Sequence, residues 1–149
     1  MEDHDSSAAA AARADQPDPI VMYLIVRESL GMGMGKTAAQ CAHASQMLML
    51  KYWRQVISFS EDVLSGDLSV APDWVKLFRE WLQGSFRKVV LKADDKEWEK
   101  VKTEFPGLYV LVVDAGLTEI AAGSETVIGL IPMRRSLVPK VIKKLQVLK

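Results

Sequence analysis

The sequence has very little cysteine and histidine, and it has no long apolar run. Its 149 residues include one cysteine, Cys41, and two histidines, His4 and His43. A single cysteine excludes an internal disulfide, and one cysteine with two distant histidines is too few to assemble a zinc site. The apolar runs are far shorter than the roughly 20 residues that cross a bilayer as a helix. These absences favour a cytoplasmic protein that uses neither a metal nor a membrane.

The net charge of zero conceals an uneven distribution. Residues 1–19 contain five acidic residues and one arginine, so residues 20–149 carry 18 basic and 14 acidic residues. We expect residues 1–19, which are acidic and alanine-rich and end in two prolines, to form a disordered tail. Residues 20–149 are long enough for a single domain. The mild basic excess of this domain permits a polyanionic partner without requiring one.

Hydrophobic runs alternate with helical patterns along residues 20–149. Four runs rich in β-branched residues predict strands at 20–27, 86–93, 108–115 and 125–132. The sequence predicts helices from about residue 36 to 57 and at 72–83, 94–105 and 135–145. This alternation favours an α/β fold, which we expect to be a three-layer α/β/α sandwich around a four-stranded mixed sheet. In such folds the functional groups gather at turns on one edge of the sheet.

A glycine-rich turn follows the first predicted strand and reads GMGMGKTAAQCAH at residues 31–43. A P-loop needs four residues between its first glycine and Gly-Lys-Thr, but Leu30 stands where that first glycine should be. The dinucleotide-binding pattern also fails, because the third glycine comes one residue early. The turn therefore argues against a nucleotide hydrolase and against a nucleotide cofactor.

The helix after this turn has two different sides at about 100° per residue. Lys36, Gln40 and His43 lie on one side, which is either a solvated surface or the wall of a polar pocket. The opposite side is expected to face the core and consists of Ala38, Cys41, Ala42, Ser45, Leu48, Met49, Tyr52, Trp53 and Val56. Cys41 is therefore expected to be a buried structural thiol rather than a nucleophile.

A second polar segment, DAGLTEIAAGSETVIG at residues 114–129, follows the third predicted strand. It contains Asp114, Thr118, Ser124 and Thr126 among glycines and other small residues. Such residues either form a turn through hydrogen bonds to the backbone, or place a carboxylate at the sheet edge as part of a site. Both alternatives remain open for this segment alone.

Together the two segments resemble the type II peptidyl-tRNA hydrolase family. The family pattern R-x-D-L followed by M-G-K-G-K-x-A-A-Q-C-x-H-A is similar to RESL and GMGMGKTAAQCAHA here. The family pattern D-A-G-x-T-x-I-x-x-G-S-x-T-V-x-G matches residues 114–129 at every specified position. The resemblance covers residues 20–149, with 58–71 as a loop insertion. It implies a strand order of 2-1-4-3 and hydrolysis of the ester between a peptide and the 3′ end of tRNA, without cofactors.

The resemblance also implies which residues form the site. The expected catalytic residues are Lys36, Gln40, His43, Asp114 and Thr118. The expected substrate-binding residues are Arg27, Gly33, Gly35, Gly116, Ser124 and Thr126, and no residue is expected to bind a metal. The implied partner is peptidyl-tRNA, and a homodimer is left open.

Direct attack by water is favoured over an acyl-enzyme, because no serine lies in a nucleophile-elbow motif. Asp114 is the candidate for orienting or deprotonating that water, or for holding Lys36 in place. Lys36 and Gln40 suit stabilisation of the oxyanion. Thr118 is a candidate for positioning the water or the terminal adenosine. His43 is expected either to act as a general acid or base or to orient the site.

Three positions depart from the family pattern. Met34 replaces the first lysine of M-G-K-G-K, Leu117 stands where a basic residue is frequent, and Ser29 replaces the aspartate of R-x-D-L. The first two changes remove cations that would contact tRNA phosphates. The alternative function is therefore a catalytically silent family member that acts as an RNA-binding or protein-interaction module.

Overall fold

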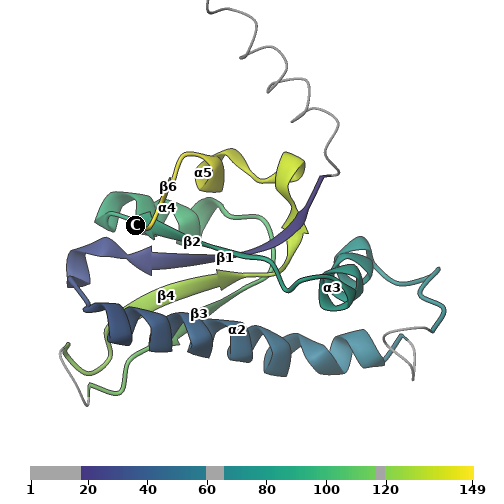
Figure 1. Ribbon diagram of the computed structural model, residues 1–149, viewed down its shortest axis with the longest axis horizontal. Helices are drawn as coiled ribbons and strands as arrows, with labels where there is room; N and C mark the ends of the chain where they lie inside the picture. Colours follow the sequence, from purple (N-terminus) through teal and green to yellow (C-terminus); the bar gives the residue numbers. More distant parts are fainter. Residues whose placement is uncertain (1–17, 60–65, 117–119) are drawn as a thin grey trace, which may run out of the picture.

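The computed structural model describes residues 18–59, 66–116 and 120–149. These residues form an α/β fold with a mixed six-stranded sheet (Figure 1). The strands follow the order β3-β4-β1-β2-β6, and β5 pairs with β1 outside this path. The predicted α/β class with a mixed sheet is confirmed, whereas the predicted number of four strands is wrong.

Four strands make up most of the sheet, namely β1 (Ile20–Arg27), β2 (Lys88–Ala93), β3 (Tyr109–Val113) and β4 (Glu125–Leu130). β1 is parallel to β2, and β4 is antiparallel to both β1 and β3. Their order, β2-β1-β4-β3, is the one that the family resemblance implied. Since β1 and β3 are both antiparallel to β4, they run in the same direction and end at the same edge of the sheet.

The two additional strands, β5 (Met133–Arg134) and β6 (Gln146–Val147), contain only two residues each. β5 pairs with the start of β1, and β6 pairs with β2. Two residues are too few to display the period-2 alternation by which a strand is predicted. These short strands could therefore not be predicted from hydrophobic patterns.

The prediction of one continuous helix at 135–145 is wrong. The chain forms a 3₁₀ turn, η2 (Arg135–Leu137), and then a short helix, α5 (Lys140–Lys143). Pro139 lies between the two, and it has no backbone N–H for the hydrogen bond that a continuous helix would need. The preceding residue, Val138, is extended, as is usual before proline.

The other helices lie close to their predicted positions. α2 (Met34–Ile57) begins slightly earlier than predicted and follows a 3₁₀ turn, η1 (Glu28–Leu30). α3 spans Asp73–Gln83, and α4 spans Asp95–Glu104. α4 begins with a capping box, in which the Asp94 carboxylate accepts from the Glu97 amide and the Glu97 carboxylate accepts from the Asp94 amide.

Two apolar clusters cover the sheet. Alternating side chains of β1 enter different clusters, with Met22 and Leu24 in one and Val21 and Ile25 in the other, so the clusters lie on opposite faces. The first contains side chains of α2 and α3, and the second contains side chains of α4 and α5. Figure 1 shows these pairs of helices on the two sides of the sheet.

The buried face of α2 differs from the predicted one. It consists of Gln40, Cys41, Ala44, Leu48, Tyr52 and Val56. Ala38 and Ala42, which were expected in the core, are exposed, and Trp53 is 38% exposed. Gln40 was expected on the polar side, but it is only 4% exposed. The core face is therefore rotated toward Gln40, whose amide can be buried because both of its ends are hydrogen-bonded, as described below.

Candidate functional site

The candidate site lies at the edge of the sheet where β1 and β3 end. Lys36 and Gln40 project from the first turns of α2, and Asp114 directly follows β3. Thr126 belongs to β4, which lies between β1 and β3. The glycine-rich turn after β1 and the turn after β3 are thereby brought together, although they are far apart in the sequence.

Asp114 is the centre of this cluster and is only 6% exposed. Lys36 Nζ forms an ion pair with Asp114 Oδ1, and Gln40 Nε2 donates to the same oxygen at 3.3 Å. The other oxygen, Oδ2, accepts from the backbone N–H of Gly116 at 2.6 Å. Both carboxylate oxygens are therefore occupied by donors, one of which is a cation.

These contacts keep Asp114 ionised. The hydrogen bond from Lys36 is the largest cause that lowers the Asp114 pKa below 3.8, and the Gly116 amide and the charges of Lys36 and His43 lower it further. Burial acts in the opposite direction. Because this pKa is lowered in the folded state, the stability that the carboxylate contributes is present above pH 3.8 and is lost as the pH falls through the folded-state pKa.

Gln40 connects Asp114 to β4. Its Oε1 accepts from Thr126 Oγ1 at 2.6 Å, while its Nε2 donates to Asp114. Thr126 Oγ1 also lies 3.3 Å from the carbonyl oxygen of Val112, but its single proton favours the shorter contact with Gln40. Thr126 is fully buried, so this hydroxyl fixes the orientation of the Gln40 amide.

Removal of the Thr126 hydroxyl is expected to destabilise the fold. A Thr126→Val variant would leave the buried Oε1 of Gln40 without its donor, which typically costs about 1–3 kcal/mol in the free energy of unfolding. Urea unfolding monitored by circular dichroism measures this loss. Thr37→Val is the matched control, since the Thr37 hydroxyl makes only a 3.4 Å contact with the Met32 carbonyl. An equal loss in both variants would contradict the proposed role of the hydroxyl.

The segment after Asp114 folds back on itself. The Asp114 amide donates to the Ser124 carbonyl at 2.9 Å, and the Gly123 amide donates to the Asp114 carbonyl at 2.9 Å. The Ser124 hydroxyl donates to the Ala121 carbonyl at 2.8 Å. Ser124 thus uses its hydroxyl within the turn, while Asp114 uses its carboxylate in the cluster. The turn that the sequence offered as one alternative is therefore present, and the Asp114 carboxylate also lies at the edge of the sheet.

Gly116 has a backbone that other residues rarely adopt. Its φ of +75° lies in the left-handed region, and a Cβ at this position would come within 2.4 Å of the Ala122 Cα. Glycine is therefore needed both for the conformation and for the close approach of the two arms of the turn. This approach presents the Gly116 amide to Asp114.

The remaining predicted residues are placed less closely. His43 is exposed on α2, and its charge contributes to lowering the Asp114 pKa. Gly33 is the N-cap residue of α2, and Gly35 lies in the first turn of the helix. Arg27 binds Asp95 through Nε at 2.9 Å and does not contact the cluster in the described part of the chain. Thr118 lies outside the described residues.

Asp95 is a partner that sequence reasoning missed. Its Oδ1 accepts from both Arg27 and Ser29, the latter at 2.7 Å, and these hydrogen bonds lower the Asp95 pKa. Ser29, which departs from the family pattern, therefore has a structural partner on α4. The only sign of this contact in the sequence was that Ser29 replaces the aspartate of the family pattern R-x-D-L.

Glu125 forms a second polar group that the sequence did not reveal. It accepts from Trp98 Nε1 at 3.0 Å and forms an ion pair with Lys102 at 2.8 Å. The hydrogen bond from Lys102 is the main cause that lowers the Glu125 pKa. These contacts join β4 to α4, on the face of the sheet opposite α2, and they stabilise the strand that carries Thr126.

Cys41 is buried, as predicted from its position on α2. Burial raises the pKa of the Cys41 thiol, which lowers the fraction of the reactive thiolate. Among the described residues, no group of three or more His, Cys, Asp or Glu side chains is placed to hold a metal ion. No described helix has the length and apolar character needed to span a membrane.

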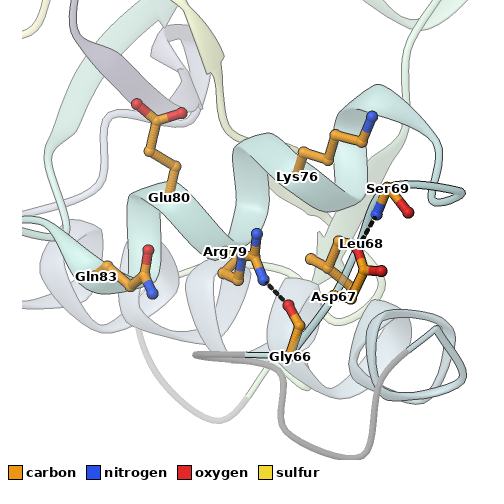
Figure 2. A pocket seen from close by; sticks show the side chains of 8 residues that line it. All are labelled: Gly66, Asp67, Leu68, Ser69, Lys76, Arg79, Glu80 and Gln83. Carbon is orange, nitrogen blue, oxygen red and sulfur yellow. Dashed lines mark hydrogen bonds between the residues drawn. The ribbon is translucent and has the colours of Figure 1, made fainter.

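A pocket of about 370 Å³ lies elsewhere, against α3. Figure 2 shows Arg79 of α3 beside Gly66 and donating to its carbonyl, whereas Glu80 points away from this loop. The Ser69 amide donates to the Asp67 carboxylate at 2.9 Å in the same loop. The pocket contains none of the predicted site residues. The hydrogen bond from Arg79 holds the described end of the loop against α3, while Glu80 accepts from Arg134, outside the pocket.

The fold and the cluster together define a mixed-sheet α/β protein with a buried lysine–aspartate pair at the edge where its parallel strands end. A family model described as "Peptidyl-tRNA hydrolase PTH2" matches residues 20–148. The chain belongs to this family.

A human, a yeast and an archaeal protein are similar to the chain. The human protein named "Peptidyl-tRNA hydrolase 2, mitochondrial" is 32% identical over 93% of this chain and 69% of its own length. The archaeal "Peptidyl-tRNA hydrolase" of Sulfurisphaera tokodaii is 33% identical over 85% of this chain and 97% of its own. "Peptidyl-tRNA hydrolase 2" of Saccharomyces cerevisiae is 32% identical over 85% of this chain. The chain spans only 57% of the yeast relative's length.

Proposed function

We propose that this chain is a peptidyl-tRNA hydrolase, which cleaves the ester between a peptide and the 3′ end of tRNA. The observation that carries the proposal is the buried ion pair of Lys36 and Asp114, with Gln40 and the Gly116 amide on the same carboxylate. Membership of the family supports it. In the reaction, water adds to the ester carbonyl, the ribose oxygen leaves with a proton, and the products are a free peptide and a free tRNA.

The contacts of Asp114 favour one of its candidate roles over the others. A carboxylate with a lowered pKa and donors on both oxygens is a weak base. Asp114 therefore acts by holding Lys36 rather than by removing a proton from water. Lys36, fixed in this way, directs its ammonium group to the oxyanion that forms as water attacks. The Gln40 amide donates to the same carboxylate oxygen as Lys36, and the Gly116 amide donates to the other oxygen, so the carboxylate itself is fixed.

The remaining roles follow from position. His43, exposed beside the cluster on α2, is the candidate general acid or base that exchanges protons with water or the leaving ribose. Thr118 is proposed from the sequence to position the water or the terminal adenosine. Gly33, Gly35, Gly116, Ser124, Thr126 and Arg27 are proposed to line or support the substrate site. The reaction is proposed to need neither a metal nor a nucleotide.

We also propose how the chain is organised. Residues 20–149 would form one domain in three layers, which the two core clusters support, after a tail at 1–19 and with an insertion at 58–71. The chain would act in the cytoplasm. Because the human and bovine relatives carry "mitochondrial" in their names, imaging of the tagged full chain in cells tests this compartment.

The alternative is a catalytically silent member that binds RNA or protein. Met34, which is 90% exposed where the family pattern has a lysine, favours this alternative. The assembled cluster of Lys36, Gln40 and Asp114 favours hydrolysis. The deciding experiment incubates the purified chain with N-acetyl-aminoacyl-tRNA and follows release of free tRNA. Multiple turnovers support the hydrolase, whereas tight binding without release supports the silent module.

Replacement of Cys41 is expected to leave the chemistry intact. Cys41→Ala removes a buried sulfur atom and should cost about 1 kcal/mol of the free energy of unfolding through lost packing. Turnover of peptidyl-tRNA should stay within about twofold of the original chain, because direct attack by water needs no thiolate. Steady-state kinetics and urea unfolding measure the two effects. Loss of turnover in a folded Cys41→Ala variant would contradict direct attack by water.

A lysine at position 34 is expected to tighten tRNA binding. Met34 lies at the start of α2, and Met34→Lys should add one phosphate contact and steepen the dependence of log Kd on log salt by about 0.9. The rate at saturating substrate should barely change, since uniform binding alters affinity and not the chemical step. Filter binding across a salt series measures the slope.

The control for this variant is Val70→Lys, which adds the same charge at a position that is 84% exposed. Val70 lies in the loop between α2 and α3, beyond the opposite end of α2 from Met34. Val70→Lys should leave the salt dependence unchanged. An unchanged slope in Met34→Lys would exclude a phosphate contact there. The equivalent change at Leu117, Leu117→Arg, tests a residue outside the described part.

A further inference from the structure

β3 forms one edge of the sheet in the described part of the chain. It pairs with β4 on one side, and no described strand lies on its other side. The Ile131 amide donates to the Leu108 carbonyl, and the Asp114 amide donates to the Ser124 carbonyl. In an antiparallel pair, every second residue directs its N–H and C=O toward the partner strand. Val110 and Val112 therefore also direct their backbone groups toward β4. Tyr109, Leu111 and Val113 therefore direct theirs outward.

The outward groups differ in how they are occupied. The Tyr109 carbonyl accepts from Lys51 Nζ at 3.4 Å and from the Tyr52 hydroxyl at 3.3 Å, both on α2. No described residue occupies the outward N–H and C=O of Leu111 and Val113. The Val113 side chain is 56% exposed. This stretch of the edge is thus open to another extended chain.

A groove runs beside this edge. It has a volume of about 470 Å³ and is lined by Met47, Lys51 and Tyr52 of α2 and by residues 107–111. Figure 1 shows α2 running next to β3, the edge strand of the sheet. Lys51 and Tyr52, which line the groove, both contact the Tyr109 carbonyl. Beyond the groove, β3 continues to Val113, which is followed directly by Asp114 of the candidate site.

We propose that the peptide part of peptidyl-tRNA binds as an extended strand along the β3 edge, with its C-terminal ester at Lys36 and Asp114. This inference rests on the proposed function. A peptide that runs parallel to β3 has its C-terminal end beside Asp114, because β3 itself ends there. Leu111 and Val113 would exchange main-chain hydrogen bonds with alternate residues of the peptide.

Main-chain binding suits this substrate. The peptides carried by tRNA vary in sequence, whereas their backbone N–H and C=O groups do not. β3 contains five residues, so at about 3.3 Å per residue it accommodates a peptide of roughly four or five residues. Side chains on one face of the bound peptide would pack beside Val113, and the others would face away. The edge therefore selects for a peptide of sufficient length and not for a sequence.

The test uses the full chain and substrate analogues that cannot be cleaved. Acetylated alanine peptides of increasing length are joined through an amide to the 3′ end of a tRNA acceptor-stem minihelix, and Kd is measured by fluorescence anisotropy. Kd should fall with each added residue that reaches the edge and level off at roughly four or five residues. In the longest analogue, single N-methyl groups are placed at each position in turn. Methylation at alternate positions should weaken binding about three- to tenfold, and methylation at the positions between should change it less than about twofold.

Two variants of Leu111 test the same contact from the protein. Leu111→Pro and Leu111→Ala both remove the leucine side chain, but only the proline variant also lacks the outward backbone N–H of residue 111. Leu111→Pro should bind the longest analogue about three- to tenfold more weakly than Leu111→Ala. This difference should disappear for the one-residue analogue, which is too short to reach Leu111. If Leu111→Pro fails to fold, the N-methyl series on the unchanged chain still decides.

The outcomes separate this inference from the proposed function. A Kd that is independent of peptide length, or N-methyl effects without alternation, would overturn binding at the edge even if the chain hydrolyses N-acetyl-aminoacyl-tRNA. Alternating effects without hydrolysis would support the edge and overturn the hydrolase. A dimer in light scattering that Leu111→Pro converts to a monomer would assign the edge to a second copy of the chain and overturn peptide binding.

Discussion

Replacing Lys36 with alanine is expected to lower the turnover of peptidyl-tRNA at least about a hundredfold, the effect of losing a preorganised donor to an oxyanion. The ammonium group is held at one position by the Asp114 carboxylate, which Gln40 in turn fixes, so it needs little reorganisation as charge develops. Asp114→Asn should cause a loss of similar size, because a neutral amide no longer holds the cation. Single-turnover kinetics on N-acetyl-aminoacyl-tRNA measure both.

The two changes should not be additive. Since Asp114 acts through Lys36, the double variant should be about as slow as either single variant. Lys92→Ala is the control, because Lys92 forms a more exposed ion pair with Glu28 at 3.2 Å and lies outside the cluster. This control should retain turnover within about twofold. Losses that multiply in the double variant would show that Asp114 has an independent role, such as activation of the water.

Replacing Gly116 with alanine is expected to disrupt the turn that presents its amide to Asp114. The left-handed φ of +75° typically costs a residue with a Cβ about 1–2 kcal/mol, and the contact of 2.4 Å with Ala122 adds to this cost. The arms of the turn must then separate, so both the free energy of unfolding and turnover should fall. Thermal unfolding and single-turnover rates measure the two effects.

Gly123→Ala is the matched control for this change. Gly123 also has a left-handed φ, +82°, but a Cβ there would meet no atom within 4 Å. Gly123→Ala should therefore show only the cost of the backbone conformation, and Gly116→Ala should be clearly less stable than it. Equal stability of the two variants would mean that the close approach of Gly116 to Ala122 is not required.

The sequence predicted the central part of the fold and the convergence of four site residues. β1 could be recognised because it is buried on both faces and therefore reads as a continuous apolar run. Lys36, Gln40, Asp114 and Thr126 do come together, as the two quoted segments implied. Their partnership could not be derived from spacing within either segment, because it joins α2 to the turn after β3 and to β4. Only the family resemblance connected the two segments.

Other features depended on contacts that no local pattern displays. The periodicity of α2 placed Gln40 on the polar side, whereas tertiary hydrogen bonds to Thr126 and Asp114 allow it to be buried. The C-terminal helix was predicted from apolar and basic residues, although Pro139 interrupts it. In each case a distant partner, or a single residue without an N–H, outweighed the local pattern.

The placement of β4 between β1 and β3 has a consequence for how the chain acquires activity. β1 and β3 cannot be joined until β4, which follows both in the sequence, has inserted between them. This pairing closes long loops, and such non-local contacts form slowly compared with helices. During synthesis α2 can form early, but Lys36 meets Asp114 in its native setting only after β4 has left the ribosome and paired. The appearance of hydrolysis in a refolding or translation reaction would therefore report completion of the sheet, and not the earlier gain of helix.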